Sequence, residues 1–132
     1  ILIVFIFVNL LAGIFSDDSN LNNTSDNVAA KIKSEKESTA KSVARDYVKA
    51  YISLKSPSTA EYGYYDYYQL ETIATSTYKI SYYIDAQNSF GATIRGYWEM
   101  KLQYMGGDND EDLIQYNNWI IKSLTFDGSK IK

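Results

Sequence analysis

Three carboxylates stand at alternate positions, Asp108, Asp110 and Asp112, within the acidic segment 106–112. Calcium loops place their first ligands at this spacing, because a short loop then brings several oxygen atoms to one ion. Such a loop also requires Gly at its sixth position and Glu at its twelfth, and the twelfth residue here is Trp119. We therefore interpret the segment as an acidic hairpin tip that keeps a sheet edge soluble, and we predict no metal site.

The residue types that most often carry catalysis are missing, since the chain contains no His and no Cys. The common pairs of nucleophile and base, and the usual zinc sites, are therefore excluded. Two carboxylates at a suitable separation can hydrolyse glycosides. Glu71, Asp85 and Glu99 are expected on the sheet, but nothing in their spacing selects a pair. The sequence predicts a protein that is not an enzyme, with no catalytic residues and no cofactor.

Tyrosine is concentrated in the segment 62–68, where five of the seven residues are Tyr. A tyrosine ring offers a rigid contact surface with a polar tip, which suits recognition of carbohydrate, peptide or protein. The alternative is a loop beside a strand in which some of these rings pack into the core. Aromatic rings also stack on single-stranded nucleic acid, but a net charge of −3 argues against that partner.

A polar turn is expected at residues 85–92, between two segments with the pattern of strands. Asn and Gly suffice to close a hairpin, so the additional Asp, Gln and Phe either form a binding tip or tie the turn internally. Arg95 can pair with Asp85 across the hairpin, which would rigidify it while adding little stability at an exposed position. The candidate binding surface therefore comprises Tyr64, Tyr65, Tyr67, Asp85, Gln87, Asn88, Phe90 and Arg95.

One amphipathic helix must precede these segments. From Ala40 to Leu54 the apolar residues follow the i, i+3, i+4, i+7 spacing of a helix with one buried face. Ser38 or Thr39 is the expected N-cap, and Pro57 ends the helix because the residue before proline avoids the helical conformation. A weaker helical pattern extends back to about Val28.

Three basic residues, Lys41, Arg45 and Lys49, recur every four residues on another face of this helix. Residues 27–55 carry seven basic and three acidic side chains, whereas residues 56–132 carry six and ten. We favour a solvated helix face over a mildly acidic sheet. The alternative is a stripe that meets anionic lipid headgroups or wall polymers.

The sequence period changes from 3.6 to 2 after residue 61. Residues 78–84 and 92–104 alternate apolar with polar, residues 113–126 suggest a third long strand, and a shorter strand is expected around 70–77. A change of register near 117–118 predicts a bulge there. The expected fold class is α+β, with one amphipathic helix packed on a four-stranded antiparallel meander. Cystatin-like and NTF2-like folds share this layout.

The chain begins with an apolar run, residues 1–15, whose only polar member is Asn9. As a helix it would measure about 22 Å, less than the hydrocarbon core of about 30 Å. It predicts either the distal part of a transmembrane anchor, which we favour, or the h-region of a signal peptide. Residues 16–27 are polar and predict a flexible linker. No basic residue precedes Lys31, so residues 28–132 should form an extracytoplasmic domain.

Two motifs carry a resemblance, LKSPSTA at residues 54–60 and DAQNSFGA at residues 85–92, with Arg95 following. Together they resemble a family of small, uncharacterised membrane-anchored proteins of Gram-positive bacteria and mobile elements, over roughly residues 40–126. That family often has a cytoplasmic zinc ribbon before one transmembrane helix, with this domain outside. The resemblance implies a membrane anchor and a domain boundary, and it implies no catalytic residue.

The sequence leaves three functions open. The first is a membrane-tethered, non-catalytic binding domain with an unknown protein or cell-wall partner, located outside the cytoplasm, or secreted if the leading segment is cleaved. The second is a structural component of a cell-envelope assembly of the conjugation or secretion type, in which such domains oligomerise. The third is a small-ligand pocket between helix and sheet. A closed core with exposed tyrosines would favour the first.

Overall fold

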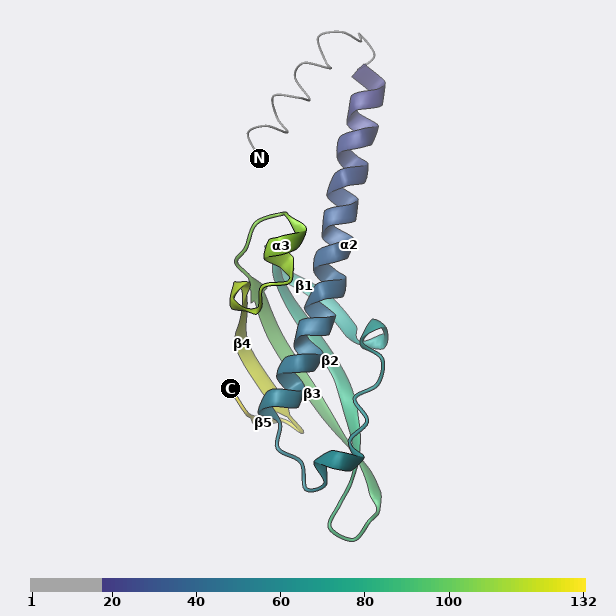
Figure 1. The fold of residues 1–132 in the computed structure, drawn as a ribbon, viewed down its shortest axis with the longest axis vertical. Helices are drawn as coiled ribbons and strands as arrows, with labels where there is room; N and C mark the ends of the chain where they lie inside the picture. The colour runs from purple at the N-terminus through teal and green to yellow at the C-terminus, as the bar shows by residue number, and fades with distance from the viewer. Residues whose placement is uncertain (1–17) are drawn as a thin grey trace. The chain divides into compact units, whose positions relative to one another are not determined.

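The computed structural model describes the backbone of residues 18–132 and the side chains of residues 23–132 (Figure 1). Helix α2 (Asp18–Tyr51) is followed by two short 3-10 turns, η1 (Pro57–Thr59) and η2 (Tyr65–Tyr67). The chain divides into two compact units, residues 1–34 and residues 35–132, and the second unit contains every strand that the structure describes. The predicted anchor, residues 1–15, lies outside the described residues.

Helix α2 begins earlier than the sequence predicts. It starts at Asp18, so residues 18–27 are helical where a flexible linker was expected. The segment is rich in Asn, Asp and Ser, which favour helices weakly. Extending an existing helix adds one hydrogen bond for each residue that is fixed, however, so propagation costs far less than nucleation. Among the residues that the structure describes, no helix has the length and apolar character needed to cross a bilayer.

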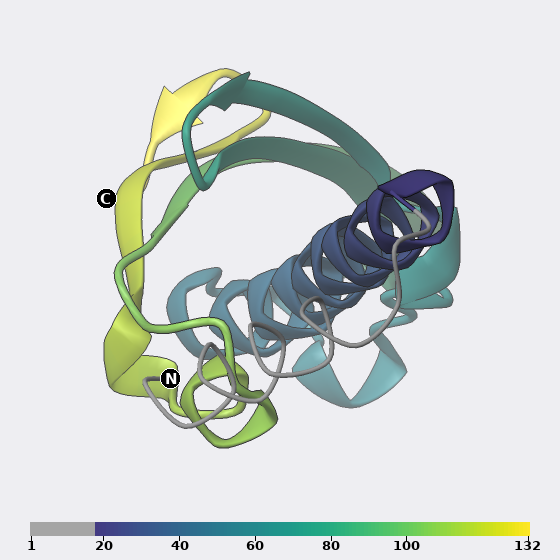
Figure 2. The ribbon, with the colours of Figure 1, turned by 90° about the horizontal axis from the view of Figure 1, so that it is seen from above.

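The apolar face of α2 is buried as the spacing predicts. Its fully buried residues form one stripe along the helix and extend to the residue after its end: Ala40, Val43, Ala44, Val48 and Ile52. Figure 2 shows the sheet curving around this part of the helix, which lies against the concave face. Because one amphipathic helix covers one face of the sheet, the other face is left to solvent.

The sheet is an antiparallel meander with strand order β1-β2-β3-β4-β5. The strands are β1 (Gln69–Ala74), β2 (Thr77–Gln87), β3 (Thr93–Tyr104), β4 (Trp119–Phe126) and β5 (Ser129–Lys130). The expected fold class is therefore confirmed, with one addition. The fifth strand is only two residues long and follows an Asp127–Gly128 turn, in which both residues have positive φ as a tight hairpin requires.

The segment 113–126 differs from its prediction as one long strand. It contains the last residue of helix α3 (Asp110–Leu113) and the 3-10 turn η3 (Tyr116–Asn118), and only then β4. The expected bulge near 117–118 is this turn. The register shift lies further on, where Lys101 pairs with Ser123 but Leu102 pairs with Ile121, so Lys122 is the extra residue.

The alternation of buried and exposed side chains along β2 and β3 determines which residues form the core. In β2 the buried residues Tyr78, Ile80 and Ile84 share one face, and in β3 Trp98, Met100, Leu102 and Tyr104 do the same. These side chains and the stripe of α2 form a single buried cluster. No buried polar or charged residue is found in the described part of the chain. The buried residues of the described core are therefore apolar or aromatic.

Candidate functional site

The two sequence motifs meet in space. Turn η1 belongs to the first motif and lies beside the end of β2, which carries the second. The hydroxyl of Thr59 donates to the carbonyl of Ser56 at 2.7 Å, and the same oxygen accepts from the backbone N–H of Gln87 at 2.9 Å. Next to it, Glu61 and Asp85 exchange two backbone hydrogen bonds as an isolated bridge. A segment 28 residues away in sequence is thus fastened to the hairpin.

We expect Thr59→Val to lower the free energy of unfolding by about 1–2 kcal/mol, because it removes one donor and one acceptor while keeping the shape of the side chain. Urea unfolding followed by circular dichroism measures the change. Ser58→Ala is the matched control, since Ser58 is exposed and makes no hydrogen bond in the described structure. Equal stability of Thr59→Val and wild type would contradict the fastening role.

The hairpin loop is held in one conformation by Asn88. Its side-chain oxygen accepts from the backbone N–H groups of Phe90 and Ala92, at 2.9 and 3.0 Å. Gly91 has a φ of +81°, a conformation that glycine adopts without strain. The turn is therefore tied internally, which was one of the two alternatives that the sequence left open. Phe90 itself is 96% exposed at the tip, so the other alternative, a binding tip, is retained as well.

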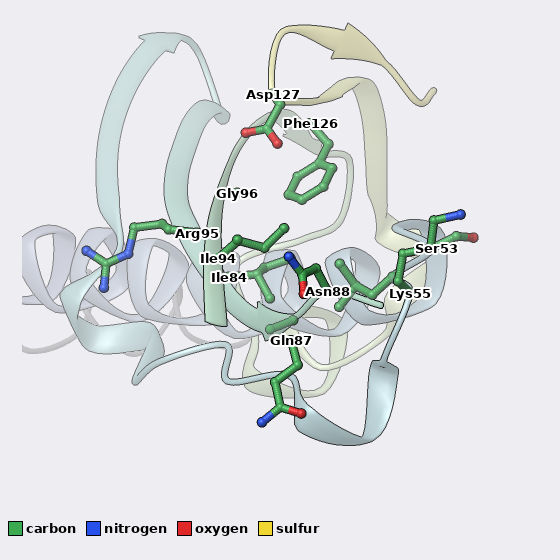
Figure 3. A pocket seen from close by; sticks show the side chains of 12 residues that line it. Ser53, Lys55, Ile84, Gln87, Asn88, Ile94, Arg95, Gly96, Phe126 and Asp127 are labelled. Carbon is green, nitrogen blue, oxygen red and sulfur yellow. The ribbon is translucent and has the colours of Figure 1, made fainter. Parts of the chain in front are cut away.

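Asp85 and Arg95 pair directly across β2 and β3, as predicted. The guanidinium group donates from Nε and Nη2 to the two carboxylate oxygens, at 2.7 and 2.8 Å. These bonds hold the pKa of the Asp85 carboxyl below its ordinary value. The arrangement is bidentate and fixes both side chains. The Arg95 side chain is therefore held against the sheet. In Figure 3 it points away from the open hollow beyond the end of α2, which is described below.

Because the pKa of Asp85 is lowered in the folded state, part of the free energy of unfolding depends on pH. Because the folded-state pKa lies below the unfolded-state value, the contribution is complete above about pH 4 and is lost as the pH falls through the folded-state pKa. We expect Asp85→Asn to reduce the loss of unfolding free energy between pH 5 and pH 2. Urea midpoints at several pH values measure this. A variant that loses stability as steeply as wild type over that interval would contradict the coupling.

An open hollow lies between the end of α2 and the concave face of the sheet (Figure 3). Its volume is about 140 Å³. Residues 53–55 line one wall, the ends of β2 and β3 line a second, and Phe126 with Asp127 lines a third. The base is apolar, from Ile84, Ala86 and Ile94. Ile94 is 56% exposed here because α2 has ended and covers the sheet no further.

Glycine at position 96 shapes this hollow. A Cβ atom there would lie 2.2 Å from Cζ of Phe126, which crosses the strand at this point. The missing side chain therefore allows the Phe126 ring to form a wall of the hollow. Sequence analysis did not single out Ile94, Gly96 or Phe126. The one sign in the sequence was a glycine, Gly96, among the residues on the buried face of β3.

The tyrosine-rich segment divides between core and surface. Tyr68 is buried, and its hydroxyl donates to the carbonyl of Tyr62 at 2.8 Å. Burial raises its pKa to about 12. Tyr62 and Tyr65 are partly buried against the core. Tyr64 and Tyr67 are 65% and 70% exposed. Of the predicted surface tyrosines, the structure therefore leaves two open to solvent and places Tyr65 against the domain.

The basic stripe of α2 faces this segment. The Arg45 guanidinium lies 5.1 Å from the ring centre of Tyr65, and the Lys49 ammonium 5.1 Å from that of Tyr62. Lys41 donates to the carbonyl of Asp66 at 3.1 Å. Each cation thus has a local partner, which favours the prediction of an ordinary helix face over a stripe reserved for lipid headgroups.

A stack of planar groups runs from the core to the surface. The ring of Tyr68 stacks on Tyr82 at 4.8 Å, and Tyr82 stacks on Tyr83 at 4.2 Å. The guanidinium of Arg95 lies 3.6 Å from the centre of the Tyr83 ring. We call these four side chains the aromatic stack. Since the two faces of Tyr83 are occupied, this ring cannot serve as a platform for a sugar or a base.

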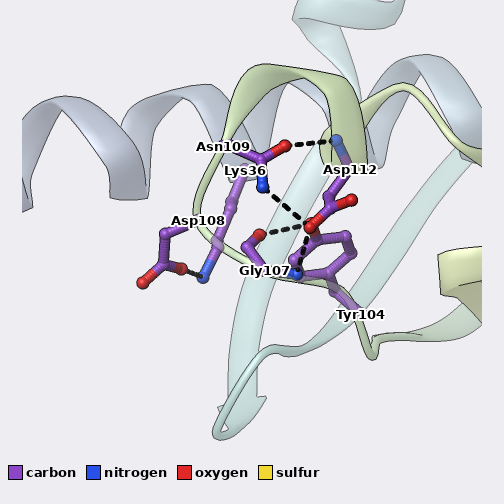
Figure 4. A network of polar contacts seen from close by, with 6 residues as sticks. All are labelled: Lys36, Tyr104, Gly107, Asp108, Asn109 and Asp112. Carbon is purple, nitrogen blue, oxygen red and sulfur yellow. Dashed lines mark hydrogen bonds and ion pairs between the residues drawn. The ribbon is translucent and has the colours of Figure 1, made fainter. Parts of the chain in front are cut away.

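The acidic loop is organised by its own hydrogen bonds (Figure 4). Asp112 accepts from Gly107 N and from the Asn109 side chain, and the Asn109 oxygen caps α3 through Asp112 N at 2.8 Å. Asp108 instead pairs with Lys36 at 2.7 Å. Asp108 and Asp112 therefore point to different partners. Within residues 23–132 no group of three potential metal ligands is found.

Comparison with protein-family models, with curated proteins and with solved structures gives no match to this chain. The resemblance carried by the two motifs therefore stays an expectation, and function is inferred from the geometry. The eight predicted surface residues fall into two groups. Five lie on or beside the hairpin: Asp85, Gln87, Asn88, Phe90 and Arg95. The other three lie at η2, where Tyr64 and Tyr67 are exposed and Tyr65 is partly buried.

Proposed function

We propose that this chain is a membrane-tethered, non-catalytic binding domain that works outside the cytoplasm and recognises its partner at the hairpin end. We define the hairpin end as the hollow together with the loop 88–92. The observation that carries the proposal is the convergence of two distant segments around an open apolar hollow, which Asn88 of the loop with the exposed Phe90 helps to line. Apolar surface on a fixed loop is typical of an interaction site.

The small volume of the hollow supports recognition of a macromolecule over a small ligand. Helix α2 fills the concave face, and the hollow at its end measures about 140 Å³. Sites for drug-sized molecules usually measure roughly 300–1,000 Å³. A pocket of the NTF2-like kind is therefore less well supported than contact with a macromolecule, which needs to place only one side chain in the hollow.

The shifted pKa values of the described residues have structural causes. In the described residues, the raised tyrosine pKa values have burial or a hydrogen bond as their largest cause, as for Tyr47, Tyr62 and Tyr116. The other shifts belong to Lys79, bonded to Glu71, and to the pair of Asp85 and Arg95. Acid–base catalysis instead needs neighbouring groups whose pKa values are driven apart within one cleft.

The proposal of a membrane tether is based on the sequence alone. Residues 1–15 are apolar except for Asn9, and residues 16–30 contain acidic but no basic side chains, which favours an outward position for the domain after them. Fractionation of the producing cells tests this part of the proposal. We expect the protein to stay with membranes after alkaline carbonate washing and to be cleaved by protease added to intact cells without an outer barrier. Protein found only in the soluble cytoplasmic fraction would overturn it.

Cross-linking in the producing cells tests the binding surface. We compare wild type with Phe90→Ser and with Ile114→Ser, a control that removes a large apolar side chain, 70% exposed, from the end of α3. Loss of a central aromatic contact reduces affinity by about tenfold or more. Proteins captured by wild type and by the control should therefore be depleted from the Phe90→Ser sample. The same captured set from all three would contradict the assigned surface.

A further inference from the structure

We infer that the hairpin end is a homotypic contact, in which Phe90 of one copy occupies the hollow of a second copy and receives that copy's Phe90 in return. This inference rests on the proposed function and names the partner of the same surface. The occupant is a second copy of this chain, because the hairpin end presents both a hollow and a side chain of matching chemistry.

The size of the hollow fits one aromatic ring. Its volume is about 140 Å³, and its base is formed by aliphatic side chains with the Phe126 ring on one wall. An apolar cavity of about 150 Å³ accepts a benzene molecule. The hollow is thus too small for most ligands and well matched to the end of a phenylalanine side chain.

Phe90 has the properties of an inserted side chain. It is 96% exposed, which makes it the most exposed large apolar residue in the described part of the chain. Asn88 fixes the loop that carries it through two backbone hydrogen bonds, so little conformational freedom would be lost on binding. Asn88 also lines the hollow. The loop that carries Phe90 therefore adjoins the hollow through Asn88, and a two-fold axis can bring this end of the domain opposite its own copy.

The charges at the rim are self-complementary. Lys55 lines one side of the hollow and Asp127 another, and in the described structure neither forms an ion pair. A two-fold axis would bring Lys55 of each copy toward Asp127 of the other, so that opposite charges meet twice. A rim of one charge sign would instead repel its own copy.

The contact is expected to be weak. An aromatic side chain buries about 150–250 Å², so two rings supply only part of the 1,200–2,000 Å² typical of stable complexes. Tethering at a common membrane raises the effective concentration and compensates for low affinity. An experiment must therefore trap the contact covalently. The chain is suited to this because it contains no Cys.

The experiment mixes two single-cysteine variants of the 132-residue chain in detergent solution under mild oxidation. Ser89→Cys places a thiol beside Phe90, and Ser53→Cys places one at the rim of the hollow. We expect the mixed disulfide dimer to form about tenfold faster than with Ser38→Cys, an exposed control about 20 Å away along α2. Placing Phe90→Ser in both chains should reduce the rate to that of the control, because both inserted rings are then lost.

Two results would overturn the inference. One is a rate with Ser53→Cys that equals the rate with Ser38→Cys, and the other is a fast rate that persists in the Phe90→Ser background. Circular dichroism of each variant verifies folding before oxidation. Absence of the mixed dimer, combined with Phe90-dependent capture of another protein in cells, would refute the homotypic contact while leaving the proposed function intact. Loss of both would refute the two together.

Discussion

Replacing Trp119 with phenylalanine is expected to lower the free energy of unfolding by about 3 kcal/mol, and the same change at Trp98 by about half as much. Both rings are 2% exposed, so both substitutions leave a similar void. The indole N–H groups differ. Nε1 of Trp119 donates to the carbonyl of Leu113 at 2.8 Å, whereas Nε1 of Trp98 has no acceptor in the described structure. Only the change at Trp119 therefore breaks a buried hydrogen bond.

Urea unfolding at pH 7, followed by far-ultraviolet circular dichroism, compares the two variants with wild type. The dependence of the unfolding free energy on urea should be the same for all three, since none changes the surface exposed on unfolding by much. If Trp98→Phe proves as costly as Trp119→Phe, the bond to Leu113 contributes nothing, and the position of α3 must be explained by packing and by the other hydrogen bonds of Asp112.

Replacing Gly63 with alanine is expected to cost about 3 kcal/mol, from two separate causes. Gly63 has a φ of +67°, which an L-residue adopts at a cost of about 1 kcal/mol. In addition, its Cβ would lie 2.6 Å from Cε1 of Tyr82, a member of the aromatic stack. Moving that ring disturbs Tyr68 and Tyr83 together, and overpacking of this kind costs about 1–3 kcal/mol.

Gly128→Ala separates these two causes. Gly128 has a similar φ of +77°, but a Cβ there meets no atom within 4 Å. The control should therefore cost only about 1 kcal/mol, and its near-ultraviolet circular dichroism should match that of wild type. The Gly63 variant should show a changed tyrosine signal in the folded state. Equal losses of stability in the two variants would mean that the stack tolerates displacement.

Periodicity predicted the parts of the fold that are set by local pattern. The buried stripe of α2 and the alternation along β2 and β3 follow from which face meets the core, so residues such as Val48, Ile80 and Met100 were assigned correctly. Each of these elements has one face against a single core, which makes its burial visible in the sequence.

The departures from prediction arise where capping, short-range hydrogen bonds and helix propagation override the pattern. Residues 113–118 were expected to begin a strand, but the Asn109 cap and the bond between Trp119 and Leu113 stabilise a helical turn. Residues 18–27 contain poor helix formers, but they continue a helix that is already formed.

The candidate site could be predicted only in part. The polar turn, the tie within it and the ion pair of Asp85 with Arg95 are local to one hairpin, so spacing was sufficient. The hollow is formed by three segments that are far apart in sequence and by a glycine that admits the Phe126 ring. No pattern within a single segment indicates such a meeting. Each of the two sequence motifs contributes residues to one wall of the hollow, but the sequence did not indicate that the two motifs lie in contact.

The long pairing of β2 with β3 has a consequence for hydrogen–deuterium exchange. The two strands pair continuously from Thr77 with Gln103 to Gln87 with Thr93, while β5 has only two residues. Amide protons in the middle of this ladder should be the last to be replaced in heavy water, and those of β5 among the first. The hairpin end is one terminus of that ladder. A molecule that binds there should slow deuterium uptake at the ends of β2 and β3, which can be measured without a label on the protein.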